Sequence, residues 1–584
     1  MSVQYRPVGW TPAKLIYDVV AVAAVAAYLL AYLRLAPLMQ PDIQPIDEGT
    51  IPIRAYGSCA LLLLSLVLCI GPLARLSPPF LPLLYNRRHL GVLTCLVALA
   101  HAYAVLDWYF AFSPTPPWEA MFATDTAQGF ARGLPFLPFG MAALLVLLLL
   151  LAATSHDFWL AFLGPALWKG LHMAVYFAYA AAVLHLALGP LLSAASPVLA
   201  WVMLGAAGVV TALHLAAAWH GRPDVAPRTA DGWVDAGPAA AIPEGGAIVV
   251  HPAEGEAVAI FRYQGMLSAV SNLCAHQGGP LGEGRVVDGC ITCPWHGYQY
   301  QIGNGRAVPP YTEMLPTYRL RLAGERVALD PRALPAGTPI PPLAVEQPGE
   351  PPAEGFFIGW ATTVAPDHRR LLAALALLLP AGFLGLGLLL GRTAVDPEGG
   401  AFDWAAGEQM LEGVATALPY PLLHLPSGET LLLGGAGKRG TALDPALDGR
   451  AVTATGVFIR RGTLRMFQTD EVVARDGAAV PAAVQPLGAF SIAGEICDGK
   501  CTSGAMRPGR GLAHRACANL CLTGELPPVF ATALPVQGSR YLLLAGADGG
   551  PLPAAARAWT AIPVTLAGEL ERRGDLLVFR VKLP

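Results

Sequence analysis

The stretch CAHQGGPLGEGRVVDGCITCPWHGYQY, from Cys274 to Tyr300, organises the rest of the chain. It contains two loops of similar composition, Cys274-Ala-His276 and Cys293-Pro-Trp-His296, separated by sixteen residues. Each loop offers one thiolate and one imidazole, and glycine or proline beside these residues favours tight turns. Two thiolates and two imidazoles can hold a [2Fe-2S] cluster, with the cysteines on one iron and the histidines on the other. The sequence therefore predicts a cluster bound by Cys274 and Cys293 on one iron and by His276 and His296 on the other.

This stretch closely resembles the Rieske family, and the resemblance covers residues 231–332. Short apolar segments punctuated by glycine and proline predict a small β domain there. In that family the quinol-oxidising branch has an extra cysteine in each ligand loop, whereas this chain has Gly279 and Trp295 at those places. The resemblance therefore implies the ferredoxin and oxygenase branch and a role in relaying electrons.

An oxygenase of this branch would also need a mononuclear iron held by two histidines and a carboxylate. The histidines after His296 are His368, His424 and His514. The first precedes an apolar run and the other two lie in the last third of the chain. The sequence therefore does not favour an oxygenase.

Composition indicates that part of the chain lies in a lipid bilayer. Hydrophobic residues make up 54% of the 584 residues, charged residues make up 14%, and the mean hydropathy is +0.49. Soluble cores alone do not account for this balance. The length predicts several domains. The net charge of -3 gives no reason to expect a nucleic-acid partner.

Seven apolar runs are long enough to span a bilayer, which takes about 20 helical residues. Six precede the predicted cluster domain and one follows it. The first exceeds the usual length of a signal-peptide core and lacks a small-residue cleavage site after it, so we expect a retained helix. The runs cover residues 15–36, 57–73, 90–112, 135–153, 166–188, 197–219 and 371–390.

The loops between the runs predict the orientation, because Lys and Arg accumulate on the cytoplasmic side of a membrane. We expect a multi-pass protein of the inner or cell membrane, with the N-terminus and the cluster domain in the cytoplasm and residues 392–584 on the periplasmic or extracytoplasmic side. The cytoplasmic loops would carry Arg6, Lys14, Arg75, Arg87, Arg88 and Lys169, and the opposite loops would carry Asp42, Asp47, Glu48, Glu119 and Asp125.

Histidines in two of the runs predict haem ligands, since ionisable residues in spanning helices are costly and mark functional sites. His89 and His101 are twelve residues apart, and His172 and His185 are thirteen apart. At 1.5 Å per residue each pair defines two levels about 18 to 20 Å apart. We therefore expect one or two haem b groups, with His89 and His172 as the inner pair and His101 and His185 as the outer pair. His214 is the rival fourth ligand, and hydrogen bonding between helices is the alternative role for these histidines.

Four motifs in this region look like the ferric reductase-like transmembrane domain, over residues 54–188. They are YNRRHLG from Tyr85, AHAYAVLD from Ala100, LAATSHDFW from Leu151 and LHMAVYFAYAAAVLH from Leu171. The resemblance implies haem in the bundle and an oxidoreductase activity. No flavin or nicotinamide domain follows the helices, and no G-x-G-x-x-G fingerprint lies on a strand-to-helix turn. The cluster domain stands where a flavoprotein would deliver electrons.

The last third of the chain contains an internal repeat. VTATGVFIRRGTLRMF at residues 452–467 and VTLAGELERRGDLLVF at residues 564–579 share their Val-Thr start, an Arg-Arg-Gly turn and a closing Phe. GETLLLGG from Gly428 and GSRYLLLAG from Gly538 precede them at nearly the same offset. Two related β modules are expected, at residues 392–480 and 481–584, each a small barrel.

The second module carries four cysteines and a histidine in one short segment. Outside the cytoplasm, two disulfides are the simplest interpretation. A metal site of three or four of these cysteines with His514 is a second, and a redox-active disulfide that accepts transmembrane electrons is a third. No C-x-x-C-H is present, which excludes c-type haem attachment. The residues are Cys497, Cys501, His514, Cys517 and Cys521.

These features predict a multi-domain membrane oxidoreductase that passes electrons between a cytoplasmic cluster and an extracytoplasmic acceptor through b-type haems. Its partners would be membrane lipid, a soluble reductase or ferredoxin, and an outer acceptor. The alternative is a non-catalytic membrane anchor that delivers electrons to a partner enzyme. The expected order is a six-helix bundle (1–220), a linker (221–230), the β cluster domain (231–332), a Pro-rich spacer (333–370), a seventh membrane helix (371–391) and the two β modules.

Overall fold

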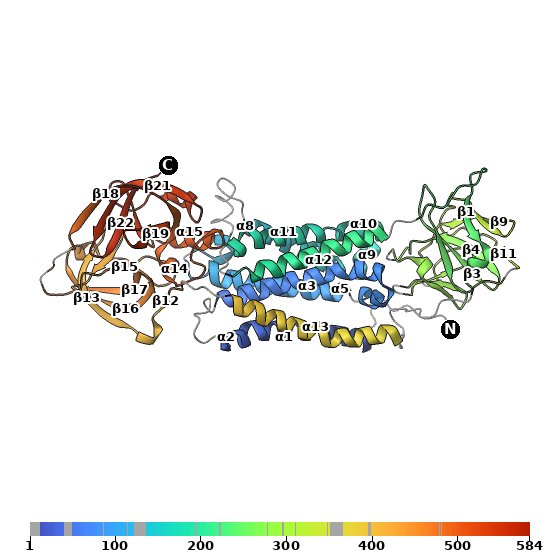
Figure 1. The fold of residues 1–584 in the computed structure, drawn as a ribbon, viewed down its shortest axis with the longest axis horizontal. Helices are drawn as coiled ribbons and strands as arrows, with labels where there is room; N and C mark the ends of the chain where they lie inside the picture. The colour runs from blue at the N-terminus through green and yellow to red at the C-terminus, as the bar shows by residue number, and fades with distance from the viewer. Residues whose placement is uncertain are drawn as a thin grey trace.

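The chain is arranged along one long axis, with a helical bundle in the middle and a β region at each end (Figure 1). The β domain that follows the sixth membrane helix lies at one end, and the C-terminal β region lies at the other. The computed structural model describes residues 12–39, 49–85, 87–113, 115–121, 136–192, 196–220, 224–276, 278–294, 297–309, 311–346, 348–350, 366–394, 399–477, 479 and 482–583.

Seven helical segments in the described ranges are long and apolar enough to cross a membrane, which confirms the seven predicted runs. They cover Lys14–Leu38, Thr50–Leu76, Arg87–Phe110, Leu137–Ser155, Leu167–Leu188, Val198–His220 and Arg369–Thr393. The main helices within them are α1 (Pro12–Leu30), α2 (Ala36–Leu38), α3 (Thr50–Leu76), α5 (Arg87–Val105), α8 (Phe136–Leu145), α10 (Pro165–His172), α11 (Val175–Leu188), α12 (Val198–His220) and α13 (Pro366–Thr393).

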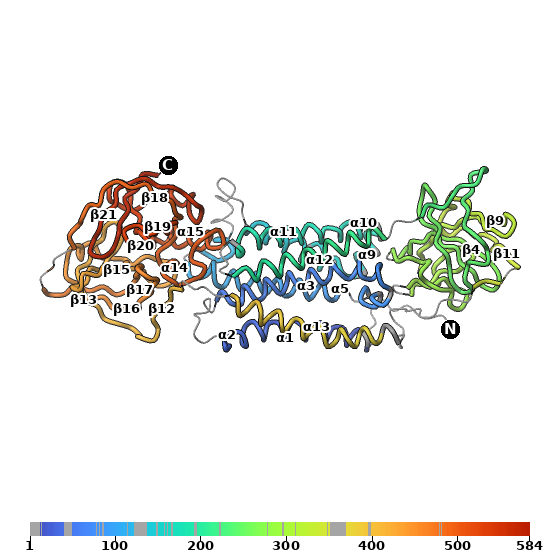
Figure 2. Tube along the Cα trace, in the orientation of Figure 1, coloured from blue at the N-terminus to red at the C-terminus, as the bar shows by residue number. Residues whose placement is uncertain are grey.

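The first and last membrane helices pack side by side along one edge of the bundle (Figure 2). Gly387 and Gly391 of α13 make the close approach possible. A Cβ on Gly387 would lie 2.5 Å from the carbonyl oxygen of Tyr28, and a Cβ on Gly391 would lie 2.7 Å from Cβ of Ala36. Small residues four apart are a common means of joining membrane helices at short distance.

The fifth membrane segment contains a break that the apolar pattern does not reveal. The prediction of one run over residues 166–188 covers both α10 and α11, and the chain makes a turn at Met173 and Ala174 between them. His172 ends α10, and His185 lies in the last turn of α11. The two histidines therefore do not share one straight helix, and their relative directions are set by the turn.

The β domain between the sixth and seventh membrane helices contains three small sheets. The ligand loops follow strands β4 and β6, so each loop starts from a fixed strand end. The sheets have the orders β1-β10-β9, β11-β4-β3-β2 with β8 beside β4, and β5-β6-β7. The strands are β1 (Val234–Pro238), β2 (Ala247–Val250), β3 (Val258–Tyr263), β4 (Met266–Ser271), β5 (Arg285–Val287), β6 (Cys290–Thr292), β7 (Gln299–Gln301), β8 (Thr317–Tyr318), β9 (Leu320–Ala323), β10 (Arg326–Leu329) and β11 (Leu343–Ala344).

The C-terminal region is built from two β modules with the same strand connections. Each module contains a ring of five strands, in which the third and fifth strands of the ring pair in parallel. Leu432 lies opposite Met466 in the first module, and Leu543 lies opposite Val578 in the second. Antiparallel pairs complete the rings β13-β14-β15-β17-β16 and β18-β19-β20-β22-β21. This is a five-stranded Greek-key barrel of the OB type. The repeated sequences form the hairpins β16–β17 and β21–β22.

The strands of the first module are β12 (Ala401–Phe402), β13 (Gln409–Thr416), β14 (Leu422–His424), β15 (Thr430–Gly434), β16 (Ala451–Arg461) and β17 (Leu464–Ala474). Those of the second are β18 (Val484–Asp498), β19 (Pro528–Val536), β20 (Ser539–Gly546), β21 (Val564–Arg573) and β22 (Leu576–Lys582). Between β18 and β19 the second module carries an insertion with the helices α14 (Gly499–Ser503) and α15 (Arg515–Thr523).

This insertion docks on the end of the helical bundle. Ala516 and Leu520 of α15 form one apolar cluster with Phe110 and Leu137. The hydroxyl of Tyr109 donates a hydrogen bond to the carbonyl of Arg507 at 2.7 Å. Apolar packing and a hydrogen bond thus join the C-terminal region to the bundle, at the end opposite the other β domain (Figure 1).

A loop of the first module extends the same interface. The backbone N–H of Lys438 donates to the carbonyl of Phe112 at 2.8 Å, and its ammonium donates to the carbonyl of Ala111 at 2.5 Å. The Lys438 side chain is buried. Both modules therefore contact the chain just beyond α5.

Candidate functional site

The two predicted ligand loops have the same hydrogen-bond geometry. The N–H of Cys274 donates to the carbonyl of Gly279 at 2.9 Å, and the N–H of Gly278 donates back to the carbonyl of Cys274 at 2.7 Å. In the second loop the N–H of Cys293 donates to Tyr298 at 2.9 Å, and the N–H of Gly297 donates to Cys293 at 2.8 Å. Each cysteine therefore starts a turn with the same pair of backbone hydrogen bonds.

Glycine is required four residues after each cysteine. Gly278 has φ +73° and Gly297 has φ +65°, in the left-handed region that other residues enter at a cost. The turn that places each ligand pair thus depends on a residue without a Cβ.

The structure brings three of the four predicted cluster ligands together. The Cys274 and Cys293 side chains are each 1% exposed and belong to one core cluster with Phe261 and Ile291. The His276 ring stacks on Tyr298, with ring centroids 4.7 Å apart and planes 8° from parallel. Two buried thiols and an imidazole in paired loops suit the ligand set of the cluster. The fourth predicted ligand, His296, lies outside the described residues.

Tyr300 connects the two ligand types. Its hydroxyl lies 3.3 Å from the Cys274 sulfur and accepts the backbone N–H of His276 at 3.2 Å. Burial raises the pKa of Tyr300 well above its ordinary value, and the neighbouring cysteine sulfurs raise it further. The phenol therefore keeps its proton and donates it towards the sulfur, which is one of the means by which proteins adjust the potential of an iron–sulfur cluster.

Tyr298 is held in place from its other end, because its hydroxyl donates to a carboxylate oxygen of Glu313. Neither Tyr298 nor Tyr300 was predicted from the sequence to take part in the site. The available signal was their position directly after the second ligand loop, alternating across Gln299 of strand β7.

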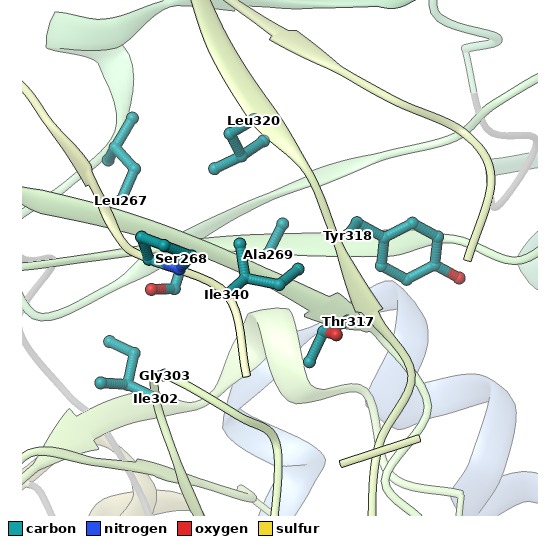
Figure 3. Close-up of a pocket in the computed structure, with 10 residues that line it drawn as sticks. Leu267, Ser268, Ala269, Ile302, Gly303, Thr317, Tyr318, Leu320 and Ile340 are labelled. Carbon is teal, nitrogen blue, oxygen red and sulfur yellow. The ribbon is translucent and has the colours of Figure 1, made fainter. Parts of the chain in front are cut away.

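The β domain also has a hollow, which Figure 3 shows among residues of β4, β8 and β9 and of the loops at Ile302 and Ile340. No predicted cluster ligand is among its lining residues, so the hollow is separate from the cluster site. The lining residues are Leu267, Ser268, Ala269, Ile302, Gly303, Thr317, Tyr318, Leu320, Ile340 and Pro341.

In the bundle, the predicted outer pair of histidines face each other. The rings of His101 and His185 have centroids 6.2 Å apart and planes at 80°. Nδ1 of His101 lies 2.9 Å from the carbonyl oxygen of Ile53. Because a carbonyl only accepts, Nδ1 carries the proton and Nε2 keeps its lone pair. A histidine held in this way is prepared to bind a metal.

Two glycines give these imidazoles their space. A Cβ on Gly140 would lie 2.6 Å from Nδ1 of His185, and a Cβ on Gly57 would lie 3.0 Å from Nδ1 of His101. The two glycines and the two facing imidazoles suit a haem site, in which His101 and His185 would hold the haem.

The predicted inner histidines contact other side chains. Nδ1 of His89 lies 2.9 Å from a carboxylate oxygen of Asp18, and because a carboxylate accepts, Nδ1 carries a proton. Nε2 of His172 lies 3.0 Å from the hydroxyl oxygen of Thr154, and its ring stacks on Trp168 at 3.8 Å. His89 and His172 as a second haem pair stay a prediction.

The rival ligand His214 has both ring nitrogens engaged. Nδ1 donates to the carbonyl of Val210 at 2.8 Å, and Nε2 accepts from the Tyr176 hydroxyl at 2.9 Å. The Tyr176 contact occupies the nitrogen that a haem iron would need. As the rival of His89 for the fourth ligand, His214 is therefore disfavoured by these contacts, and the choice between the two stays a prediction.

Three of the four late cysteines form a buried group. Sγ of Cys501 lies 4.0 Å from Sγ of Cys517 and 3.9 Å from Sγ of Cys521. His514 and Asp498 form a second such group with Cys501, and all of these residues are at most 2% exposed. Cys497 lies in the same core but not in the three-sulfur group. The spacing of the cysteines and His514 predicted this cluster, whereas no local pattern pointed to Asp498.

The thiols of this group differ in acidity. Burial raises the pKa of Cys501 and Cys521 well above the ordinary value. Burial also opposes ionisation of Cys517, but hydrogen bonds from the other two thiols, together with His514 and Lys438, lower its pKa well below the ordinary value. Cys517 is therefore the most acidic thiol of the group.

Comparison with known proteins identifies two parts of the chain. Residues 232–319 match the model of the Rieske [2Fe-2S] domain, and residues 56–183 match that of the ferric reductase like transmembrane component. The naphthalene 1,2-dioxygenase system ferredoxin component of Pseudomonas aeruginosa is 33% identical over 99 residues, which cover 17% of this chain and 94% of that protein.

Two further relatives match the same region. The naphthalene 1,2-dioxygenase/salicylate 5-hydroxylase ferredoxin component of a Ralstonia species is 31% identical and covers 17% of this chain and 93% of its own length. The solved structure of the Sphingomonas yanoikuyae B1 ferredoxin is 25% identical, with a TM-score of 0.16, and covers 17% of this chain and 98% of that chain.

These matches confirm both resemblances, and the seven apolar helices give the chain the character of a membrane electron-transfer protein. The ligand loops, the fold around them and the matched residues lead to one conclusion: the chain belongs to the Rieske [2Fe-2S] family, and carries its Rieske domain on a ferric reductase-like transmembrane component.

Proposed function

We propose that the chain passes electrons across a membrane, between a [2Fe-2S] cluster in the Rieske domain and an acceptor at the C-terminal β region, through b-type haem in the helical bundle. Cys274, His276, Cys293 and His296 would hold the cluster, and His101 with His185 would hold a haem. Cluster and haem iron, when bound, each supply a one-electron redox change. The protein contributes the positions and surroundings of both.

The observation that carries this proposal is the arrangement of the Rieske domain, the helical bundle and the two β modules. The Rieske domain and the β modules lie at opposite ends of the bundle (Figure 1), and the facing pair His101 and His185 lies between them. His101 precedes Phe110 by nine residues of the same membrane segment, and Phe110 packs on the second module. The outer haem site would thus lie on the side of the C-terminal region.

The charge pattern supports an orientation with the Rieske domain in the cytoplasm. The start of α5, with Arg87 and Arg88, and helix α10, with Lys169, lie at the bundle end that faces the Rieske domain (Figure 1). Basic residues favour the cytoplasmic side. A soluble reductase or ferredoxin would then donate electrons from the cytoplasm, and the acceptor would be extracytoplasmic.

A cofactor inventory of the purified full-length protein tests the proposal. We expect a b-type haem absorption spectrum together with a Rieske electron paramagnetic resonance signal. His185→Ala should lose haem while keeping the Rieske signal, and His214→Ala, the matched control, should keep both. Wild-type protein without haem would overturn the proposal.

Reconstitution in liposomes distinguishes a self-sufficient oxidoreductase from a subunit that delivers electrons to a partner enzyme. Protein with its Rieske domain outside the vesicle would be reduced from that side, and an enclosed soluble acceptor would be followed spectroscopically. Reduction without any added protein supports the oxidoreductase, and reduction only after a partner enzyme is enclosed supports the delivery subunit.

A further inference from the structure

The three-sulfur group of the second module has the dimensions of a metal centre. The Cys501 sulfur lies 4.0 Å from that of Cys517 and 3.9 Å from that of Cys521, and the ligand atoms of all three lie within 4.8 Å of one another. A tetrahedral ion with metal–sulfur bonds of about 2.3 Å separates its sulfurs by roughly 3.8 Å. The thiols are thus spaced as they would be around one ion.

His514 provides an independent sign of a ligand site. Its side chain is fully buried, and Nε2 lies 2.9 Å from a carboxylate oxygen of Asp498. Because the carboxylate accepts, Nε2 carries a proton, and Nδ1 is the nitrogen through which His514 would bind an ion. Nδ1 is buried and has no hydrogen-bond partner among the described residues. A carboxylate on one imidazole nitrogen and a metal on the other is the usual arrangement of a metal-binding histidine.

Asp498 is itself fixed. Its second carboxylate oxygen accepts the backbone N–H of Cys501 at 2.8 Å and so starts helix α14. One carboxylate therefore orients both the cysteine that begins the group and the histidine beside it. A buried carboxylate with both oxygens engaged makes the site rigid before any ion binds.

Buried cations surround the group. The ammonium of Lys500 donates to the carbonyls of Gly435 and Gly437 at 2.6 and 2.8 Å, and Lys438 contributes a second buried ammonium from the same loop. A site of three thiolates and one carboxylate has an excess of negative charge that burial makes costly. Two lysines and one metal cation offset that charge.

We propose that Cys501, Cys517, Cys521 and His514 bind one thiophilic metal ion, zinc or monovalent copper, in a closed centre of three sulfurs and one nitrogen. Thiolate ligands select these ions over harder ones. The Met506 sulfur, 3.5 Å from that of Cys517, adds a further soft atom at the edge of the group. With every ligand buried, the centre has the closed character of a structural site.

The metal centre would hold the insertion between β18 and β19 in the conformation that packs against the helical bundle. Cys517 and Cys521 directly follow Ala516 and Leu520, the two residues of α15 that pack on Phe110 and Leu137. An ion that ties α15 to α14 would hold this apolar face in place. This role concerns folding and docking, and it does not depend on the haem or on electron transfer.

Metal analysis of the full-length protein, purified without chelator, tests the proposal. We expect about one equivalent of zinc or copper per chain beyond the iron, and X-ray absorption at the edge of that metal should show mainly sulfur neighbours. Cys517→Ser and His514→Ala should lose most of this metal. Cys69→Ser, which changes a buried cysteine of α3, should keep it. Comparing the zinc and copper content identifies the ion.

A second measurement does not rely on variants that fold. A strong chelator should make Cys501, Cys517 and Cys521 of the wild-type protein open to alkylation, as read by peptide mass spectrometry, and should speed hydrogen exchange in α15. Wild-type protein with no such metal, in which these cysteines react only after a disulfide reductant, would overturn the proposal. Haem content and the Rieske signal should be unchanged by metal loss, so the outcome is separate from that of the proposed function.

Discussion

The Tyr300 hydroxyl lies 3.3 Å from the Cys274 sulfur while the same oxygen accepts the N–H of His276. One side chain therefore contacts a predicted ligand of each iron. Its O–H stabilises negative charge on the sulfur, and that charge is larger when the cluster is reduced. The contact thus favours the reduced state.

Tyr300→Phe should lower the midpoint potential of the cluster. A lost hydrogen bond of about 1 kcal/mol corresponds to roughly 40 mV for one electron. Redox titration followed by the Rieske resonance signal measures it. Tyr263→Phe, which removes a hydroxyl elsewhere in the domain, is the control, and equal potentials in the two variants would contradict the prediction.

Gly140→Leu should weaken haem binding at the outer pair. A Cβ at this position would already lie 2.6 Å from Nδ1 of His185, so a larger side chain must displace the imidazole, and overpacking costs about 1–3 kcal/mol. The haem-to-protein ratio is the measurement. Gly208→Leu in α12, where a Cβ meets nothing within 4 Å, should retain haem; equal loss in both variants would argue against a specific role of Gly140.

Gly387→Leu should separate α13 from α1. The carbonyl oxygen of Tyr28 lies 2.5 Å from the place of a new Cβ, and backbone does not move aside easily. We expect a loss of stability of about 1–3 kcal/mol, seen as a lower Tm of the detergent-solubilised protein. Gly382→Leu on the same helix, where a Cβ would be in open space, should leave Tm nearly unchanged.

His424 should make the first module less stable in mild acid. Burial lowers the pKa of His424 below its ordinary 6.5, and the Arg573 cation lowers it further. Below pH 6.5 the unfolded chain therefore takes up a proton that the folded chain does not, so stability falls with pH until the folded pKa is reached, by up to about 1.4 kcal/mol per pH unit.

Replacing this histidine tests the assignment. Thr416 and Thr430 contact the two ring nitrogens of His424 at 2.9 and 3.0 Å. His424→Gln still offers polar atoms to both threonines, and its side chain does not ionise. Calorimetry of the β region between pH 7 and pH 5 should show a smaller decline in the variant. Parallel declines in the variant and the wild type would show that other groups cause the acid sensitivity.

Local patterns were enough to predict the Rieske domain, the seven membrane helices and the duplicated β module. Each is recorded in residues close together in the chain: two short motifs, runs of about 20 apolar residues, and a repeat of hairpin sequences. The match between the predicted runs and the helices follows from this, because bilayer thickness fixes how long such a run must be.

Contacts between residues far apart in the chain could not be predicted from the sequence. Thr50 donates to the carbonyl of Arg507 across 457 positions of the chain, and no local pattern announces that the second module sits on the bundle. The same holds within the cysteine group. The spacing of the four cysteines did not reveal that Cys497 lies outside the three-sulfur group. Its place depends on where strand β18 ends and on how α14 and α15 fold back.

The two barrels differ in their first connection. In the first module the chain crosses from β13 to β14 in a few residues, from Thr416 to Leu422, whereas in the second the crossing from Asp498 to Pro528 holds all of α14 and α15. The second module therefore accommodates two extra helices at this connection, while its strand order stays the same as that of the first module. The matching connection of the first module, from Thr416 to Leu422, is thus the place where an inserted segment should leave the barrel intact.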